Sequence, residues 1–177
     1  MKQSFHLMKL KQNINMPKGG NAMKRYNIGT KYFEGTVDIT DPCYDKDVWC
    51  RMTAEVKPGE YECRICRRAE KVTYGGKEYN DVRVAKIGIY RDGIVPNVKL
   101  MKQIGEIGVD AGLAGFFMNK PDYNDEEWGD FCDSIRKGDA WIKDEGFFSH
   151  SGYGDGCYGV YAYKVNNEIT ALEIRFI

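Results

Sequence analysis

The C-terminal part of this 177-residue chain has the pattern of a β-hairpin, and no other stretch restricts the fold as strongly. Two runs rich in β-branched and aromatic residues, 158–165 and 168–176, are separated only by Asn166-Asn167. Asparagine tolerates the positive φ angles that a two-residue hairpin turn requires. In the second run apolar residues alternate with Glu173 and Arg175, so we expect one buried face and one wet face.

The rest of the chain has the pattern of further short β-segments with turns between them. Glycine-rich turn formers such as Lys57-Pro58-Gly59 and Gly75-Gly76 separate several of these segments. We therefore predict a mainly β (α+β) fold, an antiparallel β-sandwich or a rolled sheet, with a C-terminal β-hairpin. The remaining predicted strands lie at 32–39, 52–56, 60–68, 71–74, 81–90, 99–109, 114–118 and 141–148.

One amphipathic helix is expected at about 124–137. Asn124 and Glu127 have the spacing of a capping box, in which each side chain accepts a hydrogen bond from the other residue's backbone amide. Apolar residues then recur at the helical period and form one stripe, which consists of Trp128, Phe131, Cys132 and Ile135. We expect this helix to cover one face of the sheet.

The charges divide the chain into two parts. The first 33 residues include seven basic residues and no acidic one, whereas the rest has 19 basic and 26 acidic residues, a net charge of −7. Residues 1–22 lack apolar periodicity, and we predict a flexible basic extension there, or alternatively a basic anchor for nucleic acid or an acidic membrane. Residues 23–177 are predicted to form a single β-rich domain. Its acidic character disfavours nucleic acid as a partner.

The apolar runs and the cysteines indicate a cellular compartment. No run has the roughly 20 apolar residues of a membrane span, and no signal peptide precedes the body. We therefore predict a cytoplasmic protein whose six cysteines are free thiols. Cys63 and Cys66 form a C-x-x-C pair, but they lie in a predicted strand with no second pair at zinc spacing, so a structural role is expected.

Three predicted turns combine aspartate with glycine, proline or cysteine at the end of a strand. The first turn contains Asp41 and Cys43, and the second contains Asp110. The third is the loop before the C-terminal hairpin, whose alternating glycines permit sharp bends and a close approach of its amides to a ligand. The candidate ligand-binding residues are Asp41, Cys43, Asp110, Gly152, Tyr153, Gly154, Asp155 and Gly156.

These motifs together carry a resemblance. An Asp-Pro-Cys-Tyr turn, a central VDAGLAGFF, a tryptophan-bearing helix and a closing SGYGDGCY resemble a bacterial and phage family, domain of unknown function 4241. The resemblance spans about residues 35–177 and implies an intracellular β-rich domain. It implies no activity, cofactor or catalytic residue, and it makes a role in phage–host defence conceivable.

The three turns permit several chemistries. Asp41, Asp110 and Asp155 offer oxygen ligands for calcium or magnesium, although the spacing of a known calcium loop is missing. Cys157 is a candidate nucleophile with His150 as its base, since His150 is the only histidine of the folded body, and Cys43 is an alternative nucleophile. The alternative for each aspartate is that it accepts backbone amides and stabilises its turn.

A binding role without turnover is the function that these residues favour. No candidate catalytic group has a diagnostic spacing, and acid–base capacity near neutral pH is limited to one histidine. We therefore predict a non-enzymatic binding module for a small anionic ligand or a protein partner. The alternative is a small hydrolase-like enzyme that uses Cys157 and His150, or a metal held by aspartates.

Overall fold

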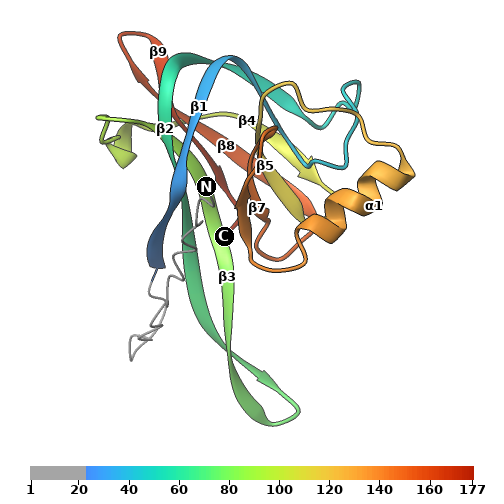
Figure 1. Cartoon of the computed structure of the whole chain (residues 1–177). Coiled ribbons are helices and arrows are strands. Elements are labelled where there is room, and N and C mark those ends of the chain that lie inside the picture. Colours follow the sequence, from blue (N-terminus) through green and yellow to red (C-terminus); the bar gives the residue numbers. More distant parts are fainter. Residues whose placement is uncertain (1–22) are drawn as a thin grey trace, which may run out of the picture.

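The computed structural model describes residues 23–177, so the predicted extension at 1–22 lies outside the described residues. The described part contains nine strands, a short 3-10 helix and one α-helix (Figure 1). The elements are β1 (Met23–Thr40), β2 (Met52–Tyr74), β3 (Lys77–Arg91), η1 (Val98–Leu100), β4 (Lys102–Val109), β5 (Leu113–Phe117), α1 (Asp125–Ser134), β6 (Ala140–Ile142), β7 (Gly146–His150), β8 (Gly156–Val165) and β9 (Glu168–Arg175).

All nine strands belong to one sheet in the order β4-β8-β9-β3-β2-β1-β5-β7-β6. Neighbours are antiparallel, apart from one parallel contact between Val56 and Ile169. The outer edge of β4 meets the β1–β2 connection, where the Gly108 amide donates to the Cys50 carbonyl oxygen at 2.8 Å. This contact curls the sheet around its own core, which confirms the predicted mainly β fold with one helix and a C-terminal hairpin.

The two larger apolar clusters lie on opposite faces of the sheet. The main core fills the inner face with side chains from every strand except β6, which packs its partly buried residues against it. The second cluster lies under α1, where Phe117 and Phe148 of the sheet meet Phe131 of the helix. Phe116 and Phe147, their neighbours in the chain, point into the main core, so β5 and β7 connect the two clusters.

The helix confirms the predicted capping box. The Asn124 side chain accepts a hydrogen bond from the Glu127 amide at 3.0 Å, and the Glu127 carboxylate accepts one from the Asn124 amide at 2.9 Å. The helix ends at Ser134 rather than near residue 137, with Ile135 as its C-cap.

Several predicted strand boundaries are wrong, because bulges and turns are hard to distinguish in a sequence. β2 is one strand where three were predicted, since Lys57 and Pro58 form a bulge opposite the single residue Glu34 instead of a turn. Proline has no amide to donate, and a bulge tolerates it. The predicted strand at 141–148 is instead two strands, because a tight turn joins Lys143 to Gly146. Strand β4 begins only at Lys102, after η1.

The hairpin formed by β2 and β3 extends beyond the rest of the molecule (Figure 1). All residues from 71 to 80 are exposed, including Tyr74 and Tyr79. None of the helices in residues 23–177 is long and apolar enough to cross a membrane.

Candidate functional site

The three predicted aspartate turns are neighbours in the structure. The Asp41 carboxylate accepts hydrogen bonds from the amides of Asp110 at 2.9 Å and Ala111 at 2.7 Å. The carbonyl oxygen of Gly112 accepts one from the Ser151 amide at 3.0 Å. The β1–β2, β4–β5 and β7–β8 connections therefore form one junction at this end of the sheet.

Asp41 stabilises this junction from inside the protein. Its side chain is fully buried, and its second oxygen accepts a hydrogen bond from the Cys43 amide at 2.9 Å. Burial raises the pKa of Asp41, and the three amides only partly offset this. With both oxygens engaged by backbone amides, Asp41 has the turn-stabilising role rather than that of a ligand.

The other two aspartates do not join Asp41 in a cation site. The side chains of Asp110 and Asp155 are exposed. Within residues 23–177, no group of three histidine, cysteine, aspartate or glutamate side chains is placed to hold a metal ion. The aspartate-bound metal thus gains no geometric support.

The Gly152–Gly156 loop is fixed by contacts to the base of the β2–β3 hairpin. Arg83 donates to the Gly152 carbonyl oxygen at 3.0 Å, and its guanidinium lies 4.9 Å from the ring centre of Tyr153. The Tyr153 hydroxyl donates to Glu70 at 2.7 Å. Gly152 has a φ of 68°, and a Cβ there would lie 2.9 Å from the Cβ of Phe176, so only glycine suits this position. The loop is first of all a structural corner.

A shallow groove of about 400 Å³ lies beside this corner. Its charged walls are largely paired, because Arg83 binds Asp81 and because Asp139 receives two hydrogen bonds from Arg67 outside the groove. His150 and residues 151–154 also line the groove. These paired charges indicate no particular class of ligand.

No observed contact joins His150 and Cys157 in the described part of the chain. The His150 ring packs edge-on against Trp141, with ring centres 5.2 Å apart, and no hydrogen bond joins the imidazole to the Cys157 thiol. Cys157 is exposed at the start of β8, opposite Gly108. For Cys43, burial and the nearby charge of Asp41 raise the thiol pKa to about 12, so its reactive thiolate is scarce at neutral pH.

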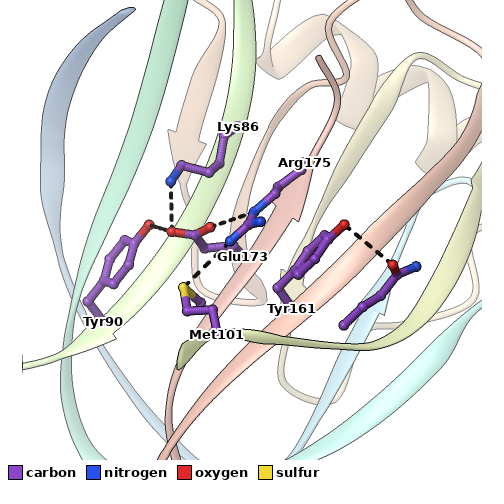
Figure 2. Close-up of polar contacts among 7 residues, drawn as sticks. Lys86, Tyr90, Met101, Tyr161, Glu173 and Arg175 are labelled. Atoms are coloured by element: carbon purple, nitrogen blue, oxygen red, sulfur yellow. Dashed lines mark hydrogen bonds and ion pairs between the residues drawn. The ribbon is translucent and has the colours of Figure 1, made fainter. Parts of the chain in front are cut away.

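A second site lies on the outer face of the sheet, around Glu173 of β9 (Figure 2). Its carboxylate accepts hydrogen bonds from Lys86 at 2.7 Å and from the Tyr90 hydroxyl at 2.7 Å. Arg175 donates to the other oxygen at 2.9 Å. Only 2% of the Glu173 side chain is exposed, so this is a buried and fully paired anion.

Two glycines make this cluster possible. Gly88 of β3 lies directly opposite Glu173, and a Cβ on it would lie 2.6 Å from the Tyr90 hydroxyl oxygen. Because Gly88 has no side chain, the Tyr90 ring can lie over it, and the Tyr90 hydroxyl reaches Glu173. Likewise Tyr161 of β8 lies over Gly159, with its ring centre 3.8 Å from the Arg175 guanidinium.

The cluster has fixed protonation states at neutral pH. Burial by itself raises the pKa of Glu173, but the hydrogen bonds and charges of Lys86, Tyr90 and Arg175 outweigh burial and hold that pKa below its usual value. Burial and the Glu173 charge raise the pKa of Tyr90. Glu173 is thus ionised and Tyr90 is neutral.

A small, partly open pocket of about 60 Å³ adjoins Glu173. Antiparallel pairing puts Arg25 of β1, Cys66 of β2 and Lys86 of β3 side by side, with Arg64 two residues away from Cys66 along β2. Arg64 binds Glu62 and lies 4.9 Å from the Tyr90 ring centre. Arg25 has no ion-pair partner among the described residues. The pocket is lined by Arg25, Arg64, Ile65, Cys66, Lys86, Tyr90, Val95, Pro96, Val98 and Glu173.

Comparisons with models of protein families, with curated proteins and with solved structures find no match to this chain. The predicted resemblance to domain of unknown function 4241 therefore stays a prediction. Sequence reasoning missed the Glu173 pocket, because its residues come from four strands and form no local motif. The two tripeptides Gly88-Ile89-Tyr90 and Gly159-Val160-Tyr161 are the signal that was present.

Proposed function

We propose that this chain is a non-enzymatic binding module for a small anionic ligand, and that the pocket beside Glu173 holds the anion. One observation carries the proposal: the pocket has more positive than negative charge. Arg25, Arg64 and Lys86 line it, whereas its single carboxylate, Glu173, is already saturated by hydrogen bonds. Arginine and lysine donors in a confined pocket favour a carboxylate or phosphate.

The size of the pocket agrees with a small acidic group. A cavity needs only roughly 10–15 Å³ of such volume to hold one water molecule, so about 60 Å³ accommodates a few waters or one phosphate-sized group. The Arg25 guanidinium has donors to offer because it pairs with no carboxylate of the described residues. A bound phosphate or carboxylate would displace water and pair with Arg25 while Glu173 keeps its partners.

The same pocket is poorly equipped for catalysis. General acid–base catalysis needs a group whose pKa lies near the working pH. Glu173 and Tyr90 have pKa values shifted away from neutrality in opposite directions. Burial also raises the pKa of the Cys66 thiol, although Lys86 and Arg25 partly offset it. These shifts support binding over turnover; a link to phage–host defence still depends on the resemblance alone.

The test is titration of the protein with inorganic phosphate, at constant ionic strength with chloride as the replaced ion. We expect a saturable rise in the melting temperature, because a ligand that binds only the folded state stabilises it. The variant Arg25→Ala should bind phosphate about tenfold more weakly or worse, since one charge-assisted contact is lost. Calorimetric titration of both proteins gives the affinities.

Arg136→Ala is the matched control. It removes the same charge from an exposed position on the far side of the molecule, at the end of α1, and should leave phosphate affinity unchanged. If phosphate, sulfate and acetate all fail to stabilise the wild-type protein more than chloride does, the proposal is wrong. If Arg25→Ala binds phosphate as tightly as wild type does, the anion binds outside the Glu173 pocket.

A further inference from the structure

An apolar segment lies at the mouth of the Glu173 pocket. In this segment, residues 94–101, Val95 is 91% exposed, Leu100 59% and Val98 48%. Val95 and Val98 also line the pocket. Figure 1 shows the segment, which contains η1, standing out from the sheet at the left of the molecule. Three exposed aliphatic side chains beside a cationic pocket are an unusual combination for a solvated loop.

The segment is an ordered part of the structure rather than a loose loop. The Asn97 side chain accepts a hydrogen bond from the Lys99 amide at 3.1 Å, and the Leu100 amide donates to the Asn97 carbonyl oxygen at 2.9 Å. At the end of the segment Met101 is buried, and its sulfur accepts a weak hydrogen bond from the Arg175 guanidinium at 3.8 Å. The aliphatic side chains are therefore held outward by the fold.

The pocket is small, about 60 Å³, and the exposed Val95 and Val98 line it. A large group attached to a bound anion would therefore extend past these two side chains. These side chains project into solvent instead of lining a second cavity, so a hydrophobic attachment would meet them outside the protein. An array of lipids provides such an arrangement, with phosphates at the level of the cations and acyl chains beyond them.

We propose that this face binds the surface of a membrane that contains anionic phospholipids, a proposal that rests on the proposed anion-binding function. A lipid phosphate enters the pocket at Arg25, and Val95, Val98 and Leu100 insert among the lipids. The exposed Lys99 within the segment and Lys102 directly after it add attraction to neighbouring phosphates, while Asp92 is the one exposed carboxylate of the preceding turn.

The test is sedimentation of the protein with vesicles of phosphatidylcholine alone and of phosphatidylcholine mixed with phosphatidylglycerol. Wild type should sediment with the mixed vesicles only. Leu100→Ser should lower the vesicle partition coefficient about fivefold, since one inserted aliphatic side chain is lost, and should keep its affinity for inorganic phosphate. Arg25→Ala should weaken both interactions.

Val82→Ser is the matched control, because Val82 is 47% exposed on the β2–β3 hairpin and should not affect vesicle binding. If wild type binds phosphate but ignores the mixed vesicles, the membrane proposal fails and the anion pocket survives. Equal binding to neutral vesicles would also overturn it, because the pocket would then play no part. If wild type binds no phosphate, the proposed function itself fails.

Discussion

At the scale of single residues, Glu173 shows where sequence reasoning succeeds and where it stops. The alternation in 168–176 correctly places Glu173 on the face opposite Leu172 and Ile174. The expectation that this face is wet is wrong at this position, because Tyr90 and Met101 form a second apolar layer over it. A periodicity of two separates the faces of a strand, but it does not show what covers each face.

Glu173→Gln should lower the free energy of unfolding at neutral pH by about 2 kcal/mol, because an amide cannot accept from all three donors. The folded-state pKa of Glu173 is depressed, so its contribution is present above its unfolded pKa and is lost as the pH falls through the folded value. Chemical denaturation at pH 7 and below about pH 4 measures this. The stability gap between wild type and variant should shrink in acid; a constant gap would contradict the assignment.

Asp41 illustrates the opposite outcome at the same scale. Asp41 accepts backbone amides, as the turn-stabilising alternative for each aspartate predicted. One of these amides lies in its own turn, and the other two lie in a turn distant in the sequence. The sequence predicted three similar turns, and they do meet. Their residue types alone did not distinguish a buried bridging carboxylate from the exposed Asp110 and Asp155.

At the scale of elements, local chemistry predicted α1 and the C-terminal hairpin, whereas bulged strands were misread. A capping box and a two-residue turn depend on residues adjacent in sequence, and both occur as predicted. The bulge at Lys57 and Pro58, followed by Gly59, contains typical turn residues, and only the pairing of the flanking residues with β1 shows that this stretch belongs to one strand.

The cap of α1 offers a direct test at this scale. Asn124→Ala should destabilise the protein by about 1 kcal/mol, because the Glu127 amide loses its acceptor at the helix start. Asn80→Ala, at an exposed position of the β2–β3 hairpin, is the control and should change stability by much less. Urea denaturation of the three proteins compares them. An equal loss in both variants would show that the cap contributes nothing specific.

At the scale of the whole molecule, the Glu173 pocket depends on strand register. Arg25, Arg64, Lys86 and Glu173 come from β1, β2, β3 and β9, and they become neighbours only through the pairing of all four strands. No spacing in the sequence encodes this arrangement. The Gly-x-Tyr tripeptides of β3 and β8 were informative, but only once β9 is known to lie between them.

The main core and the cluster under α1 should unfold together, since β5 and β7 contribute to both. Trp128 and Trp141 report on the cluster under α1, and far-ultraviolet circular dichroism reports mainly on the sheet. In a Trp49→Phe background, which removes the 90%-exposed tryptophan, both probes should give the same urea midpoint. An earlier fluorescence transition would show that α1 and its cluster form a separate cooperative unit.

The strand order also has a consequence for synthesis on the ribosome. β8 and β9 lie between β3 and β4 in the sheet, yet they are translated after both. The nascent chain can pair β1, β2 and β3 early, but β4 has no neighbour in the sheet until residues 156–165 leave the exit tunnel, and β8 reaches β3 only through β9. The edge of β3 that pairs with β9 therefore stays open while residues 92–167 are translated, a period in which an unpaired strand edge exposes the nascent chain to aggregation.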